Sequence, residues 1–112
     1  MDMEEMLKAA QAAAEKIQQQ MNDVQVTLDS LEVEGSSGGG LVKIRATAKG
    51  RILSVSIDDS LIVPEDKQML EDLVTAAFND ARTKADLAAE LEMHKAQSGM
   101  GLPPGFKLPG MG

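Results

Sequence analysis

Residues 41–57, LVKIRATAKGRILSVSI, decide the fold of this chain. Apolar and polar residues alternate in two runs, which is typical of strands with one buried face. Lys49-Gly50 separates the runs and predicts a β-hairpin with a two-residue turn, in which Ala48 faces Arg51. This register predicts an apolar face of Val42, Ile44, Ala46, Ala48, Leu53, Val55 and Ile57. The opposite face then holds Lys43, Arg45, Thr47, Ile52, Ser54 and Ser56.

The segment before the hairpin predicts one long helix. Apolar residues recur in steps of four and three over about four heptads, namely Met3, Leu7, Ala10, Ala14, Ile17, Met21, Val24, Leu28 and Leu31. A helix of this length runs about 40 Å, which exceeds a compact monomer of this chain length. Part of it must project into solvent or be covered by a partner. Because the flanking positions lack complementary charges, we expect packing on another helix of the same fold, partly across a dimer.

The segments between and after these elements complete the order. Glu32–Gly35 fits a short third strand, and residues 36–40 fit a flexible connector. A second long helix begins near Pro64, with an apolar stripe of helical period formed by Leu70, Leu73, Val74, Ala77, Phe78, Ala81, Ala85 and Ala88. We expect one domain over residues 1–97 and a flexible Gly/Pro-rich tail over residues 98–112.

These elements predict an α+β protein with a long N-terminal helix, a small antiparallel three-stranded sheet and a long C-terminal helix. A three-stranded sheet has free edges, so two copies joining their sheets would remove an aggregation risk. We therefore expect a homodimer.

Charge is unevenly distributed along the chain. The 112 residues carry 11 Lys and Arg against 18 Asp and Glu, a net charge of −7, yet residues 36–57 contain four bases and no acid. The first candidate contacts for a polyanion are these four bases, Lys43, Arg45, Lys49 and Arg51. The second set lies on the helices and comprises Lys8, Lys16, Arg82 and Lys84. The alternative for the first set is a solvated sheet face whose cations prevent edge aggregation. With two Phe, no Trp and no Tyr, base stacking is disfavoured and any nucleic-acid contact should be to phosphates.

Catalytic and metal chemistry find no support in the sequence. There is no Cys, and His94 is the single His. Gly38-Gly39-Gly40 lacks the Lys-Ser/Thr that a phosphate loop requires, and Asp58-Asp59 fits a turn or cap. We expect no enzyme activity, cofactor, metal or small-molecule substrate. The acidic start MDMEEMLK excludes an ordinary secretory signal, and no run reaches the length of a membrane span, so a cytoplasmic protein is expected.

Nearly the full length resembles the YbaB/EbfC family of bacterial nucleoid-associated proteins. The likeness rests on the Met/Gln/Ala-rich first helix and on the ordered segments EGSSGGGLV, AAFNDA and LPPGFKLPG. The resemblance implies an α+β homodimer with associated sheets and projecting helical arms, which binds double-stranded DNA, alters its conformation and locates to the nucleoid. If the arms hold the DNA, Lys8, Lys16, Arg82 and Lys84 become stronger candidates for DNA contacts than the hairpin bases.

Two other functions remain open at this stage. The heptad helix and the tail would suit a protein-interaction adaptor whose DNA binding is incidental. A weaker alternative is the accessory subunit of an enzyme.

Overall fold

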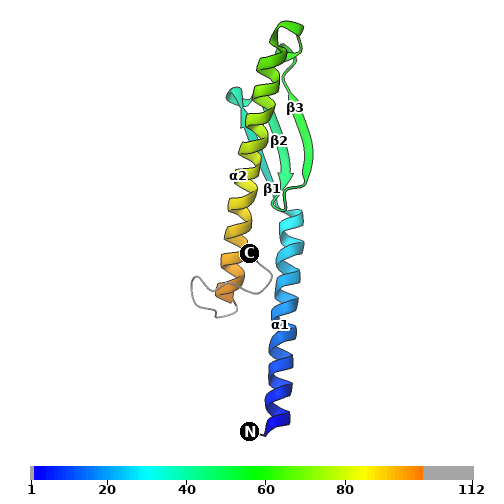
Figure 1. The fold of residues 1–112 in the computed structure, drawn as a ribbon, viewed down its shortest axis with the longest axis vertical. Coiled ribbons are helices and arrows are strands. Elements are labelled where there is room, and N and C mark those ends of the chain that lie inside the picture. The colour runs from blue at the N-terminus through cyan, green and yellow to red at the C-terminus, as the bar shows by residue number, and fades with distance from the viewer. Residues whose placement is uncertain (1, 100–112) are drawn as a thin grey trace.

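The computed structural model describes residues 2–99 as two long helices and a three-stranded antiparallel sheet (Figure 1). The helices are α1 (Met3–Ser30) and α2 (Lys67–Gly99), and the strands are β1 (Glu32–Ser37), β2 (Val42–Thr47) and β3 (Ile52–Ile57). Short 3-10 turns cover Gly38–Gly40, Asp59–Leu61 and Pro64–Asp66. The predicted α+β class and element order are confirmed. The predicted tail lies outside the described residues, except for 98 and 99.

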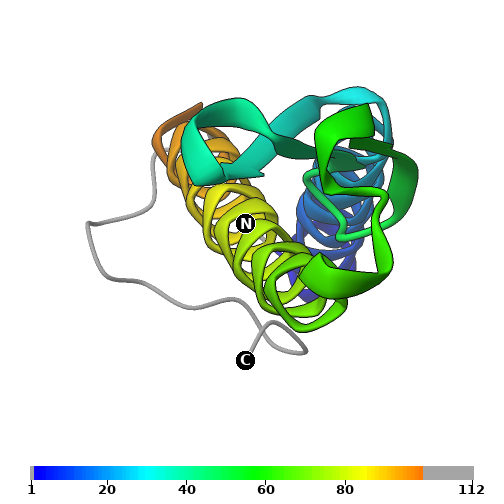
Figure 2. The ribbon, with the colours of Figure 1, turned by 90° about the horizontal axis from the view of Figure 1, so that it is seen from above.

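The sheet has the order β1-β2-β3, and β2 is its central strand. β1 is longer than predicted, because it continues through Ser36 and Ser37 to pair with Lys43 and Val42. The connector therefore begins only at Gly38. All three strands lie on one side of α2, as the view along the long axis shows (Figure 2).

The hairpin differs from the predicted two-residue turn. Thr47 donates its N–H to the carbonyl of Arg51 at 2.8 Å, and Gly50 donates to the carbonyl of Thr47 at 2.8 Å, so three residues form the loop. Gly50 has a φ of +93°, the left-handed conformation that follows the tight turn in three-residue loops. Lys49-Gly50 suits either loop length, which is why the sequence pattern did not separate them.

A β-bulge restores the predicted register farther from the loop. Ala46 pairs with Ile52, whereas Arg45 pairs with Ser54, so Leu53 is the extra residue. Consequently Ile52 shares the face of Ala46 that looks toward α2, and its predicted place on the opposite face was wrong. From Arg45 to Val42 the predicted pairing with Ser54 to Ile57 is confirmed.

The main core lies between α2 and the inner face of β1 and β2. Its buried residues are Val42, Ile44, Leu61, Ala77 and Ala81. Alanines on α2 let the helix approach the sheet closely. At Gly35 of β1, a methyl group would collide with the backbone of Ala77 and Ala81, so only glycine fits at this contact.

The first helix is only partly supported by the rest of the molecule. Asp2 caps its N-terminus by accepting a 2.8 Å hydrogen bond from the N–H of Glu5. Near the other end, Val24 and Leu28 pack with Ala48 in a second core cluster, against Ala88, Ala89, Met93 and Ala96 of α2. The N-terminal part of α1 extends past the end of α2, giving dimensions of 76 × 22 × 18 Å (Figure 1). The predicted projecting arm is thus present in the single chain.

Candidate nucleic-acid interface

Side chains of α2 form hydrogen bonds with the backbone at one edge of the sheet, β1. On β1, the N–H of Ser36 donates to the carboxylate of Asp80 at 2.9 Å, and the carbonyl of Glu34 accepts from Lys84 at 2.9 Å. Lys84 also pairs with Asp80 at 3.0 Å. Both contacts hold the pKa of Asp80 below its usual range, the Ser36 N–H contributing most. Side chains of α2 therefore occupy the edge of β1.

Among residues 2–99, no further strand pairs with the opposite edge, β3. Ile52 and Val55 are 43% and 44% exposed although both belong to the sheet. In Figure 1 β3 is the strand farthest from α2. An apolar strand with a free edge is a surface on which another strand can pair.

On the outer face of the sheet, acids of β1 lie beside bases of β2. Glu34 pairs with Arg45 and Ser36 with Lys43 in the strand register. The Arg45 guanidinium also contacts both carboxylate oxygens of Glu32, at 2.8 and 2.9 Å. This hydrogen-bonded pair raises the pKa of Arg45 above its ordinary value. The hairpin is purely basic in sequence, but β1 neutralises part of its charge in the fold.

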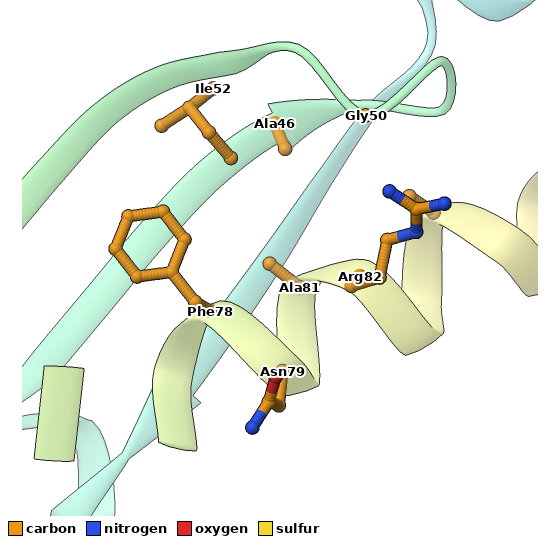
Figure 3. Close-up of a pocket in the computed structure, with 8 residues that line it drawn as sticks. Ala46, Gly50, Ile52, Phe78, Asn79, Ala81 and Arg82 are labelled. Atoms are coloured by element: carbon orange, nitrogen blue, oxygen red, sulfur yellow. The ribbon is translucent and has the colours of Figure 1, made fainter. Parts of the chain in front are cut away.

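The hairpin loop forms the second group of cations. Lys49 and Arg51 are exposed, and the guanidinium of Arg82 reaches from α2 toward Gly50 at the loop (Figure 3). Arg82 also contacts Asp86 at 3.1 Å in an exposed pair, which costs little to rearrange. The fold thus joins members of both predicted sets into one loop cluster, defined as Lys49, Arg51 and Arg82.

Beside the loop cluster, a pocket of about 220 Å³ opens between β3 and α2. Phe78 and Ile52 point toward each other across it, and Ala46 and Ala81 lie beside them on the side of Gly50 (Figure 3). Phe78 is 38% exposed. The pocket contains no catalytic set of side chains and continues the exposed apolar surface of β3.

The remaining predicted bases lie apart from this cluster. Lys8 and Lys16 are exposed on the projecting half of α1. Lys84 is engaged at the edge of β1, as described above. Lys43 is exposed on the outer face of the sheet beside Ser36 and Ser56. Within residues 2–99, ion pairs engage Arg45, Arg82 and Lys84, but not Lys8, Lys16, Lys43, Lys49 or Arg51.

Three acids that shape this surface did not emerge from the charge pattern: Glu32, Asp80 and Asp86. Two of their pairs have the i,i+4 spacing of a helical acid–base pair, Asp80 with Lys84 and Arg82 with Asp86, so this spacing could have identified them. The Glu32–Arg45 pair requires the register of β1 on β2, which no local sequence pattern predicts.

Other kinds of site are not seen in the described part of the chain. Among residues 2–99, no three His, Cys, Asp or Glu side chains come together as metal ligands. No helix in the same range is long and apolar enough to cross a membrane.

Comparison with known proteins finds similar proteins that share one name, nucleoid-associated protein. A nucleoid-associated protein of Methylocella silvestris is 48% identical over 108 residues, covering 96% of this chain and 97% of the relative. One from Rickettsia bellii is 49% identical over 96 residues, covering 86% and 90%. The solved structure of the uncharacterized protein HP0035 from Helicobacter pylori has the same fold, with a TM-score of 0.63 at 22% identity, covering 89% of this chain and 97% of that one.

The family model that matches this sequence is described as the YbaB/EbfC DNA-binding family, and the match runs over residues 1–100. With nearly the whole chain matched and relatives close to half identical, this protein belongs to the YbaB/EbfC DNA-binding family.

Proposed function

We propose that this protein binds double-stranded DNA mainly through phosphate contacts and alters the conformation of the duplex. The observation that carries the proposal is the loop cluster, in which Arg82 of α2 reaches the hairpin loop beside the exposed Lys49 and Arg51, in a chain of a DNA-binding family. Lys43 is a further exposed cation, on the outer face of the sheet away from the loop. Fields of exposed charges are screened beyond about 8–10 Å, so a local cluster can attract phosphates although the net charge is −7.

The readout of DNA sequence should be weak. The loop cluster offers two guanidinium groups and one ammonium, which suit phosphate oxygens. The described surface presents one aromatic side chain, Phe78, which lies at the apolar pocket between β3 and α2. Contacts to phosphates position a protein on DNA without reading bases.

The functional unit we propose is a homodimer joined through β3. The edge of β1 is occupied by Asp80 and Lys84, whereas β3 is free and carries exposed Ile52 and Val55 beside Phe78. Burying this surface against a second copy would remove both the free edge and the apolar patch. Pairing would also double the number of cations on one particle, so that both copies can hold a single duplex and bend or bridge it.

The names of the relatives support a place in the nucleoid. The proteins of Methylocella silvestris and Rickettsia bellii are both called nucleoid-associated. A protein that binds phosphates with little sequence preference would be distributed widely over chromosomal DNA. We accordingly propose a role in nucleoid organisation, with an influence on gene expression, and no enzymatic step.

The contact surface is tested by two sets of alanine variants in the full chain. The hairpin variant replaces Lys43, Arg45, Lys49 and Arg51, and the arm variant replaces Lys8 and Lys16. Binding to a labelled duplex is measured over a range of salt concentrations. The hairpin variant should bind more weakly and with a flatter salt dependence, because each lost phosphate contact lowers the slope by about 0.9. The arm variant should bind almost like the parent chain. The reverse result would move the interface to the arms.

The conformational effect needs a separate measurement. Energy transfer between dyes at the two ends of a short duplex reports bending. We expect transfer to rise as the protein binds. Binding with unchanged energy transfer would show that the protein does not bend a single duplex. Bridging between two duplexes would then be the remaining conformational effect, and an assay with two differently labelled duplexes detects it.

A further inference from the structure

Among residues 2–99, other parts of the chain cover the apolar stripe of α1 along only part of its length. Val24 and Leu28 are buried against α2, and Ala96 is among the last residues of α2 that contribute to this contact. Beyond the end of α2, Met3, Leu7 and Ile17 are 78%, 59% and 37% exposed. We call the exposed part the arm stripe, defined as Met3, Leu7, Ala10, Ala14 and Ile17. It is continuous with the buried part on the same face of the helix.

An uncovered arm of this kind is costly for the protein. A single helix of about 15 residues is only marginally stable in water, and exposed Leu, Ile and Met on one face lose the stabilisation of burial. The remainder of α1 gains that stabilisation from α2. A further segment packed on the arm stripe would therefore stabilise this part of α1.

The chain itself supplies such a segment at the right place. α2 runs antiparallel to α1 (Figure 1). It ends at Gly99, shortly after Ala96, which lines a groove together with Lys95 and with Gln20 of α1. Thirteen residues, 100–112, follow in the sequence. The route that continues α2 leads along α1 toward its N-terminus. An extended chain covers about 3.1 Å per residue, so the seven steps from Gly99 to Phe106 cover about 22 Å. The arm stripe from Ile17 to Met3 is about 21 Å long.

The composition of this segment matches the stripe. It contains Leu102, Phe106 and Leu108, with Pro103, Pro104 and Pro109 between and after them, and its single charge is Lys107. Proline lowers the entropy lost when an extended segment is bound. In addition, the side-chain oxygen of Gln20, where cover by α2 ends, is buried and has no hydrogen-bond donor among residues 2–99. A backbone N–H of a chain passing this point would satisfy it.

We propose that residues 102–108 of the same chain dock on the arm stripe and cover it in the DNA-free protein. Leu102 meets the stripe near its Ile17 end, and Phe106 lies toward Leu7 and Met3. The docked segment extends the packing of α2 on α1 and so stabilises the projecting arm.

Hydrogen exchange of the full chain tests this proposal without DNA. The docking variant carries Leu102→Ser and Phe106→Ser, and the matched control carries Met111→Ser, outside the docking segment. We expect amides of residues 3–17 to exchange about tenfold faster in the docking variant, since two large apolar side chains are lost from the contact. The control should exchange like the parent chain at low and high protein concentration.

Two results would overturn the proposed docking of residues 102–108 on the arm stripe. Equal exchange in all three proteins would show that the segment does not cover the arm. Protection that rises with protein concentration and persists in the docking variant would assign the stripe to a second copy of the chain.

Cysteine pairs give an independent reading, because the chain has no native Cys. Leu7→Cys with Phe106→Cys should form an intramolecular disulfide readily under mild oxidation. The matched control, Ala12→Cys with Phe106→Cys, places the first thiol on the opposite face of α1. Equal rates of disulfide formation in the two pairs would contradict docking on the stripe.

Discussion

Arg45 of β2 contacts both carboxylate oxygens of Glu32 of β1, at 2.8 and 2.9 Å. The base that looks free in the sequence is therefore held by an acid from the neighbouring strand. Both side chains are about half exposed, so the pair is not a rigid internal bridge. A phosphate could compete with Glu32 for Arg45, and the acid thereby tunes the affinity of the surface.

The first prediction concerns this competition. Glu32→Gln should free Arg45 for a phosphate and strengthen DNA binding, with the salt slope steeper by about 0.9 per bound chain. Fluorescence anisotropy on a labelled duplex measures both quantities. The control is Glu71→Gln, which removes the same charge from the exposed surface of α2. A gain of equal size in both variants would show that only net charge matters.

The second prediction concerns the close contact of β1 with α2. Gly35→Ala should lower the free energy of unfolding by about 1–3 kcal/mol, since the added methyl group collides with the backbone of Ala81 and the two elements must separate. Gly39→Ala meets no atom within 4 Å, so its cost is limited to about 1–2 kcal/mol of strain from a positive φ. Urea denaturation of both variants compares them. A Gly35→Ala protein as stable as the parent chain would refute the packing described.

The third prediction follows from the lowered pKa of Asp80. Its carboxylate is stabilised in the folded state by the Ser36 N–H and by Lys84. As pH falls, the unfolded chain takes up this proton first. The contribution to stability is therefore full above the usual pKa of about 3.8 and is lost as pH falls below it toward the folded value.

Accordingly, Asp80→Asn should be less stable than the parent chain at neutral pH, and the difference should shrink below about pH 4. Denaturant titrations at several pH values measure it, with Glu90→Gln as a control charge change on the same helix. The difference in free energy of unfolding between the parent chain and Asp80→Asn could instead stay constant down to the acid transition. That result would argue against a charged contact at β1.

The fourth prediction concerns the proposed dimer. Val55→Lys places a charge within the exposed apolar surface of Ile52, Val55 and Phe78 and should give a monomer, because the proposed interface would have to bury an unpaired ammonium group. Ser54→Lys adds the same charge one residue away, on the outer face beside Arg45, and should remain dimeric. Light scattering after gel filtration gives the masses. If Val55→Lys remains dimeric, the interface lies elsewhere.

The sequence predicted the elements well because their periods differ clearly. The heptad of α1 and the alternation of residues 42–57 each define one type of element and one apolar face. What the pattern could not fix were relationships between elements. Gly50 fits both loop lengths, so the bulge at Leu53 and the inward face of Ile52 appeared only in the structure.

For the candidate surface, the sequence identified the bases but not their neighbours. Arg82 reaches the hairpin loop through the packing of α2 on the sheet, and Lys84 is used at the edge of β1. Neither fact follows from positions along the chain. The assignment of bases to DNA contacts stays a prediction.

The most direct test of the proposed function is the salt dependence of binding to a labelled duplex, measured by fluorescence anisotropy at about 50 and 200 mM salt. The loop cluster of Lys49, Arg51 and Arg82 from two copies would provide six phosphate contacts. For about six contacts, affinity should fall about 10³-fold between these salt concentrations. Absence of binding at the lower concentration, or binding that hardly changes with salt, would contradict recognition of DNA through phosphates.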